Sequence, residues 1–265
     1  MEILTLLFAL LIGLVLGLTG AGGSILTVPL FTYLMKYDVI TATAYSLFVV
    51  SVSSAVGAIK NYRTGNIHIK GALSFAIPSI VMVSLTRALF VPLIPEVIFK
   101  IGSYTLFRQN MMLGIFAVFM IYAGYKMLQS AKLEETILVI DKKHSVKLAV
   151  LGVILGATIG FLGAGGGFMI VPALVLLARM TMKNAVGTSL LLISLNSGVG
   201  FLSSLDELEG TDWGMLIKFS ALMIIGIVVG GIFEEKINAA QLKKGFAVLV
   251  FIVAAWIIYL EFFML

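Results

Sequence analysis

Residues Gly163 to Pro172 read GAGGGFMIVP, and residues Gly20 to Pro29 read GAGGSILTVP, nearly the same sequence 143 positions earlier. Both stretches lie within apolar sequence that otherwise has the composition of membrane-spanning helices. Irregular backbone at membrane depth is stable only where protein buries it or where it lines a water-filled cavity. A helix break that occurs twice therefore indicates a designed feature of the fold.

The composition restricts the class of protein. The 265 residues are 60% hydrophobic and 12% charged, and their mean hydropathy is +1.13, whereas soluble domains carry about 25% charged residues. Apolar runs of roughly 17 to 25 residues recur along the chain and predict an all-α polytopic membrane protein. The chain has no cysteine, which excludes thiol chemistry and cysteine-based metal sites.

Short basic loops indicate the topology. The loops richest in Lys and Arg are 60–70, 130–147 and 234–244, and the positive-inside rule places all three in the cytoplasm. The loop 205–213 carries four acids and no base, so we expect it outside. The ten apolar segments lie at 3–19, 25–35, 41–59, 71–94, 111–129, 147–162, 168–178, 184–203, 214–233 and 245–263.

Counting the crossings singles out the glycine-rich segments. If 147–178 were one broken span, every later loop would violate the positive-inside rule. If 147–162 and 168–178 form a hairpin that enters and leaves on one face, all the loops agree. The segment 168–178 would be about 16 Å of helix, half of a core about 30 Å thick. We therefore predict a re-entrant pair with its glycines at membrane depth.

The repeat extends this prediction to the whole chain. An offset of 143 without gaps pairs Gly13 with Gly156 and Ser51 with Ser194. Each half then contains one re-entrant or broken helical hairpin and three transmembrane helices, and an odd number of crossings makes the halves inverted repeats. We assign the first repeat to residues 1–130, a cytoplasmic linker to 131–146 and the second repeat to 147–265. Both termini then lie outside, and the arrangement is typical of secondary transporters.

The glycines suggest an anion site. Proline is best tolerated in the first turn of a helix, so we expect helix to begin near Val171 and the preceding backbone to be partly unwound. Free N–H groups at a helix start attract anions, and we expect the two apices to meet near the midplane. The alternative is close helix packing, whereas a dinucleotide motif lacks its strand and its acidic residue. The candidate ligands are Gly20, Ala21, Gly22, Gly23, Ser24, Gly163, Ala164, Gly165, Gly166 and Gly167.

Polar residues recur on one face of the span that follows each hairpin. Ser53, Ser54, Asn196 and Ser197 fall near mid-membrane and could donate hydrogen bonds to an oxyanion, or they could simply join helices. Arg87 is the one strong charge well inside an apolar segment, where it would either attract an anion or snorkel to the outer surface. The polar candidates are Ser53, Ser54, Thr188, Ser189, Asn196 and Ser197.

Two motifs resemble a known family. The duplicated GxxGAGGG followed by VP, together with NAVGTSLLLISLNSGVGFL at 184–202, resembles the sulfite exporter TauE/SafE family, also called the toluene-sulfonate uptake permease family. The resemblance covers residues 3 to 263. In the first half Ser24 replaces the third glycine, and Ala44-Tyr45-Ser46 replaces Gly187-Thr188-Ser189. The resemblance implies transport of sulfite, sulfoacetate or a related organosulfonate across the cytoplasmic membrane.

The sequence therefore predicts an inner-membrane secondary transporter of small sulfur-containing anions that works by alternating access. An anion channel and a membrane scaffold without flux are the alternatives. We expect no enzymatic activity, no cofactor, no metal and no nucleic-acid partner. The expected partners are the substrate anion and the lipid bilayer, and the small-residue faces would allow a homodimer without requiring one.

Overall fold

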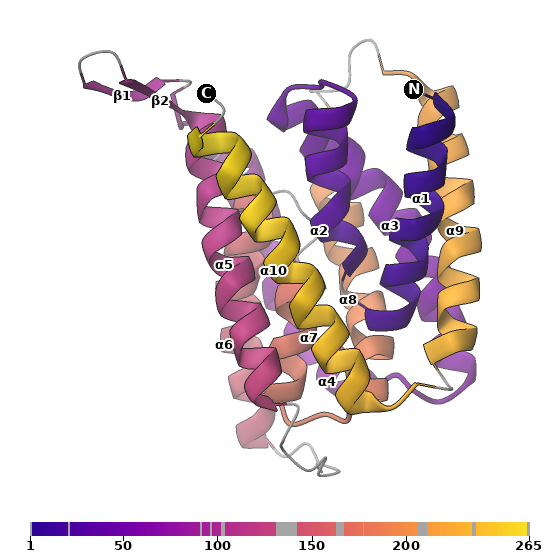
Figure 1. Ribbon diagram of the computed structural model, residues 1–265. Helices are drawn as coiled ribbons and strands as arrows, with labels where there is room; N and C mark the ends of the chain where they lie inside the picture. Colours follow the sequence, from indigo (N-terminus) through magenta and orange to yellow (C-terminus); the bar gives the residue numbers. More distant parts are fainter. Residues whose placement is uncertain are drawn as a thin grey trace.

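A computed structural model describes residues 2–20, 22–90, 92–95, 97–101, 104–130, 142–162, 167–176, 178–205, 211–234 and 237–263. Within these ranges ten α-helices form one bundle (Figure 1). The first half contributes α1 (Glu2–Thr19), α2 (Gly22–Pro29), α3 (Val39–Arg63), α4 (Ile69–Leu85) and α5 (Arg108–Ser130). The second half contributes α6 (Lys142–Leu162), α7 (Gly167–Leu176), α8 (Met182–Leu202), α9 (Trp213–Glu234) and α10 (Ala239–Phe263).

Six of the described helices are long and apolar enough to cross a membrane, namely α3, α4, α5, α8, α9 and α10. Each half supplies three of them, as the sequence predicts. The chain is thus an all-α polytopic membrane protein. The remaining helices form two shorter pairs, α1 with α2 and α6 with α7, at the positions of the two glycine-rich stretches.

The two halves pack in corresponding ways. Helix α1 packs on α9, and its counterpart α6 packs on α4, while α3 contacts α8 and α5 contacts α10. A Cβ on Gly13 would overlap the carbonyl of Met223, and a Cβ on Gly156 would overlap the carbonyl of Ser79. Glycines paired by the 143-residue offset thus permit the same backbone approach twice. This exchange of partners supports the predicted inverted repeat.

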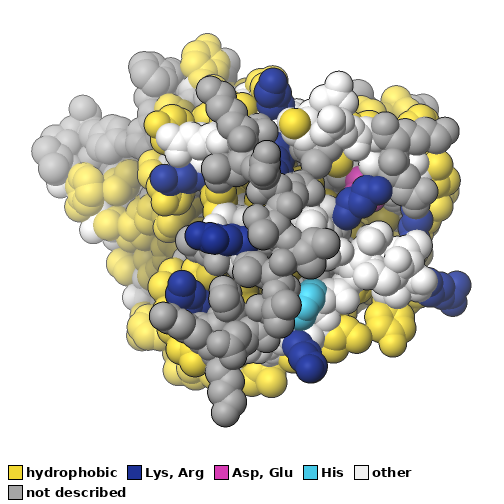
Figure 2. All heavy atoms as spheres, turned by 90° about the horizontal axis from the view of Figure 1, so that it is seen from below, with side chains coloured by type: hydrophobic (Ala, Val, Ile, Leu, Met, Phe, Trp, Pro, Cys, Tyr) yellow, Lys and Arg dark blue, Asp and Glu magenta, His cyan; other side chains and the backbone are white. Residues whose placement is uncertain are grey.

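Basic residues from several helix ends lie together at one end of the bundle. Figure 1 shows both termini at the upper end, and the end of α5 and the start of α6 at the lower end. Figure 2, seen from below, shows Lys and Arg side chains spread over the lower face. The helix ends that supply them carry Lys60, Arg63, Lys70, Lys183 and Lys244. The described ends of the three basic loops therefore lie at one end of the bundle.

Two features of the secondary structure differ from the predictions, the segment before α5 and the start of α7. An antiparallel ribbon, β1 (Val97–Ile101) and β2 (Tyr104–Phe107), precedes α5 and was not anticipated. Helix α7 begins at Gly167 and not near Val171, so Pro172 lies inside the helix. Starting earlier lets the carbonyl groups of Met169 and Ile170 pair within the helix, which matters where no water is available. The carbonyl of Phe168 lies opposite Pro172, which has no N–H to donate.

Proline has a different consequence in the first hairpin. Pro29 is the last residue of α2, and the chain continues as a π-helical turn, η1 (Leu30–Leu34). Proline removes one i→i−4 hydrogen bond, and π-turns commonly accompany such interruptions. A second π-helical turn, η2 (Thr86–Phe90), follows α4. This second turn carries Arg87.

Candidate functional site

Helices α3 and α8 run together through the bundle, and their contact lies between equivalent residues of the two halves. The Ser51 hydroxyl donates a hydrogen bond of 3.0 Å to the carbonyl oxygen of Ser194, exactly one repeat offset away in the sequence. Small polar residues let two such helices approach closely. Equivalent positions of the sequence repeat therefore meet where α3 contacts α8.

Buried polar side chains lie on both sides of this contact. Ser53, Asn196 and Ser197 are completely buried. The Asn196 amide nitrogen donates to Ser79 Oγ on α4 at 2.8 Å. Among the described residues, Ser53 Oγ, Asn196 Oδ1 and Ser197 Oγ make no hydrogen bond. By contrast, Ser54 donates to the Val50 carbonyl one turn earlier in its own helix.

We call the buried polar side chains along α3 and α8, such as Ser53, Asn196 and Ser197, the polar path. At one end of this polar path, the first hairpin meets α8. Ser189 Oγ lies 2.9 Å from the carbonyl oxygen of Gly20 and 2.8 Å from that of Val186, and its one hydroxyl proton is shared between them. Gly20 has a φ of +66°, which glycine adopts without strain. A Cβ there would lie 2.7 Å from Ser189 Oγ. Gly20 and Ser189 are thus brought together, with the hydroxyl proton directed at protein carbonyls.

Thr188, the neighbour of Ser189 on α8, holds the loop that joins α3 to α4. The backbone N–H of His68 donates to Thr188 Oγ1 at 3.1 Å, and Gly187 lies against the Asn66 carbonyl. Thr188 is completely buried. This geometry gives Thr188 a role in closing the lower end of the bundle.

At the other end of the path, Arg87 points into the protein. Its Nε donates to Ser204 Oγ at 2.6 Å and its Nη2 donates to Thr43 Oγ1 at 3.0 Å. Each hydroxyl in turn donates to its own helix, Ser204 to the Gly200 carbonyl and Thr43 to the Ile40 carbonyl. Arg87 is only 3% exposed. The alternative in which Arg87 snorkels to the surface is therefore wrong.

The described end of α6 reaches this same region. A Cβ on Gly160 would lie 2.9 Å from the Cβ of Thr86, the residue before Arg87. Gly20, by contrast, lies against the first half of α8. Helices α2 and α7 contact one another. The described ends of the two hairpins thus lie against different helices, and most of the second hairpin's glycines, which we expect to meet those of the first near the midplane, fall outside the described residues.

Part of the predicted anion site lies outside the described residues. This holds for Ala21, Gly163, Ala164, Gly165 and Gly166, and the side chain of Ser24 is likewise not described. Gly22 and Gly23 form the first turn of α2, and Gly167 begins α7.

Three residues of the path were missed from the sequence. Thr43, Ser79 and Ser204 lie at or inside apolar segments, and their burial depends on contacts with distant helices. The local indication for Thr43, Ser79 and Ser204 in the sequence is that each is a polar residue at or inside an apolar segment.

Comparison with protein families gives one result across nearly the whole chain. The model described as "Sulfite exporter TauE/SafE" matches residues 5–257. The chain belongs to this family. No solved structure matches it.

Curated relatives of this TauE/SafE family member carry transporter names. A "Probable membrane transporter protein" of Xylella fastidiosa strain Temecula1 is 28% identical over 260 residues, covering 94% of this chain and 92% of the relative. One from Methanocaldococcus jannaschii is 28% identical over 245 residues, covering 89% and 85%. "Probable membrane transporter protein YdhB" of Bacillus subtilis is 26% identical over 249 residues, covering 91% and 94%. Family and relatives together make this chain a membrane transporter.

Proposed function

We propose that this transporter carries a small sulfur-containing anion, either sulfite or an organosulfonate such as sulfoacetate. The single observation that carries the site is the group of buried polar atoms without partners on α3 and α8, Ser53 Oγ, Asn196 Oδ1 and Ser197 Oγ. A buried polar group left unpaired costs about 1–3 kcal/mol. Such groups call for a ligand or an ordered water.

The chemistry of these groups suits an oxyanion. A serine hydroxyl donates readily to a sulfonate or sulfite oxygen. Asn196 can also present a donor, because Ser79 Oγ both donates and accepts. Turning the amide by 180° therefore keeps the Ser79 contact and directs Nδ2 toward the unpartnered side.

Arg87 supplies positive charge at one end of the path. An ionisable residue inside a membrane segment is costly and usually serves function. The hydroxyls of Thr43 and Ser204 fix the guanidinium at 3.0 Å and 2.6 Å, so its position does not depend on the substrate. We propose that Arg87 draws anions toward the polar path. We also propose that the glycine-rich stretches offer backbone N–H groups to an anion along that path.

The positive-inside rule supports one orientation. With the basic face of Figure 2 in the cytoplasm, both termini lie outside the cytoplasmic (inner) membrane. Each hairpin then enters and leaves on one face, α1 and α2 from outside and α6 and α7 from inside. Rocking of the hairpins against the six spans would open the path to each side in turn.

An anion channel and a scaffold without flux are the rival functions. A channel would conduct without saturation through a continuous pore, and a scaffold would give no flux at all. Gly165→Val provides a further distinction: loss of transport by a folded protein favours ligand binding at the glycine stretch, whereas loss of folded protein favours packing.

The testing experiment is solid-supported-membrane electrophysiology on proteoliposomes with sulfite, sulfoacetate, thiosulfate, sulfate and chloride. A saturable transient current with one sulfur anion, weakened in Ser197→Ala, is the expected result. Thermal stability with each anion is measured in parallel, because a bound ligand stabilises the folded protein. Stabilisation without current would indicate electroneutral transport, and absence of both would overturn the sulfur-anion assignment.

A further inference from the structure

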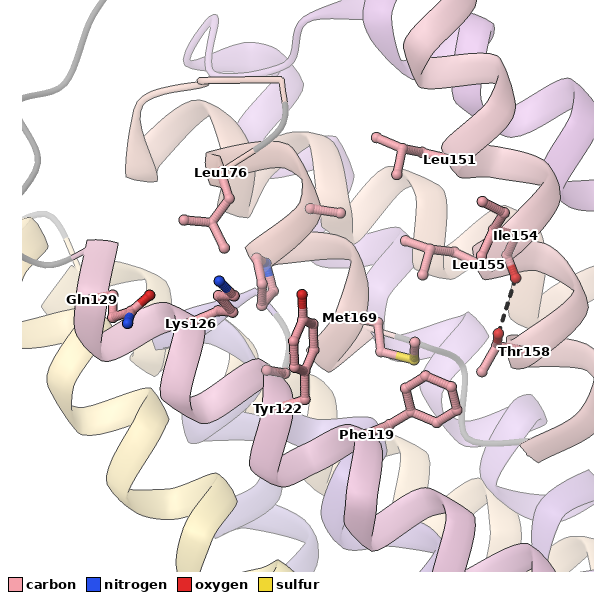
Figure 3. Close-up of a pocket in the computed structure, with 13 residues that line it drawn as sticks. Phe119, Tyr122, Lys126, Gln129, Leu151, Ile154, Leu155, Thr158, Met169 and Leu176 are labelled. Atoms are coloured by element: carbon pink, nitrogen blue, oxygen red, sulfur yellow. Dashed lines mark hydrogen bonds between the residues drawn. The ribbon is translucent and has the colours of Figure 1, made fainter.

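A groove of about 530 Å³ lies between α5, α6 and α7, away from the polar path. Figure 3 shows its walls, with Phe119 and Tyr122 projecting from α5 and Leu151 and Leu155 from α6. Met169 of α7 forms part of its floor. The lining is therefore mostly apolar, unlike that of the path along α3 and α8.

The groove opens toward the surrounding bilayer. Tyr122 is 61% exposed and Ile154 is 56% exposed, and both belong to the lining. A large apolar side chain that is more than half exposed on a membrane-spanning bundle faces hydrocarbon. Lipid chains consequently have direct access to this groove.

One end of the groove is polar and positively charged. Lys126 and Gln129 lie in the last two turns of α5, at the end of the bundle where Figure 2 shows the basic side chains. Lys126 Nζ lies 5.9 Å from the ring centre of Tyr122. Gln129 Nε2 donates to the Tyr125 hydroxyl at 2.9 Å. Lys126 is the one charged side chain among the described lining residues.

We propose that this groove binds an anionic phospholipid, with its phosphate at Lys126 and one acyl chain along Phe119, Leu155 and Met169. Charge complementarity decides the occupant, because a lone cation at the mouth of an apolar groove matches one negative headgroup above a hydrocarbon tail. A small hydrophilic anion would leave the apolar walls unused, and a zwitterionic lipid would gain less from Lys126.

The inverted repeat makes this a one-sided site. The corresponding groove would lie between α10, α1 and α2. The second half of α10, residues 251–263, contains no Lys or Arg. An anionic lipid is thus expected only against α5, where it contacts the short helix α7.

The experiment measures which lipid stays with the full-length protein. The wild type, Lys126→Gln and Lys244→Gln are purified from equimolar phosphatidylglycerol and phosphatidylcholine, and retained lipids are counted by native mass spectrometry. Lys244 is exposed at the same end of the bundle and does not line the groove, so it is the matched control. Removing one interfacial base lowers anionic-lipid binding about fivefold, and we expect that loss in Lys126→Gln alone.

A second pair of variants tests the acyl-chain position. Ile154→Trp fills the groove, whereas Val153→Trp places the same side chain on an exposed face of α6 outside it. Only Ile154→Trp should lower the number of retained lipids. Equal losses in Lys126→Gln and Lys244→Gln, or retention of phosphatidylglycerol by Ile154→Trp, would overturn the proposal. Displacement of the lipid by sulfite would instead identify the groove as part of the substrate route.

Discussion

The hydroxyl of Ser51 donates to the main-chain carbonyl of Ser194, although the two serines occupy the same position in the two repeats. A hydrogen bond has a donor and an acceptor, so two equivalent residues cannot play identical roles in it. The two repeats therefore differ at this bond, where α3 contacts α8. Their neighbours show the same divergence, since Ser54 bonds to its own helix whereas Ser197 makes no hydrogen bond among the described residues.

Substitution of these two serines should reveal the difference. Ser51→Ala removes the donor and should lower the free energy of unfolding by about 0.6 kcal/mol, the average for hydrogen bonds between membrane helices. Ser194→Ala keeps the accepting carbonyl and should have a smaller effect. Unfolding in mixed micelles at increasing SDS fractions measures both. Equal losses would mean that the side chain of Ser194 also holds the helices together.

The unpartnered hydroxyl of Ser53 leads to an opposite prediction for stability and transport. Ser53→Ala removes a buried group that lacks a hydrogen bond, so stability should stay constant or rise by about 1 kcal/mol, while transport current falls. Ser54→Ala is the matched control, because its hydroxyl bonds within α3, and transport by this variant should persist. Full transport by a destabilised Ser53→Ala protein would assign Ser53 to packing alone.

The sequence alone predicted those parts of the fold for which the evidence is local or repeated along the chain. Apolar length identified the six spans, and the repeated glycines located both hairpins. The burial of Arg87 was harder to predict from the sequence, because it depends on Thr43 and Ser204, which lie 44 and 117 positions away. The β-ribbon was missed because residues 95–110 fall between two predicted membrane segments, 71–94 and 111–129, and were assigned no secondary structure. A strand pair depends on the partner strand as much as on its own composition.

The upstream glycines should behave alike in the two halves. Gly13→Ala would place a Cβ in the Met223 carbonyl, and Gly156→Ala would place one against the Ser79 carbonyl. Overpacking of this kind costs about 1–3 kcal/mol, so each variant should lose thermal stability by a similar amount. Gly245→Ala is the control, since nothing lies within 4 Å of its Cβ position, and it should be neutral or stabilising. A neutral Gly156→Ala beside a damaging Gly13→Ala would contradict the corresponding packing of the halves.

The planar guanidinium of Arg87 should matter beyond its charge. Arg87→Lys retains a cation, but one ammonium group cannot reproduce the fork that reaches both Thr43 and Ser204. We expect it to fold and to show a raised apparent KM for the sulfur anion. Arg87→Gln removes the charge and should lower transport further. Arg63→Gln, an exposed arginine at the opposite end, serves as the control in current measurements. An unchanged apparent KM in Arg87→Gln would exclude the proposed attraction of anions.

The re-entrant hairpin can be tested directly, because the chain has no cysteine to remove. Lys147, in the second turn of α6, and Lys183, at the start of α8, are exposed. Single cysteines at these positions should both react with an impermeant maleimide from the cytoplasmic side alone. Leu93→Cys, at a site 77% exposed after α4, should react only from outside. If α6 and α7 together crossed the bilayer once, the cysteines at 147 and 183 would react from opposite sides. This seventh crossing, added to the six spans, would leave the termini on different faces, and the inverted repeat would have to be abandoned.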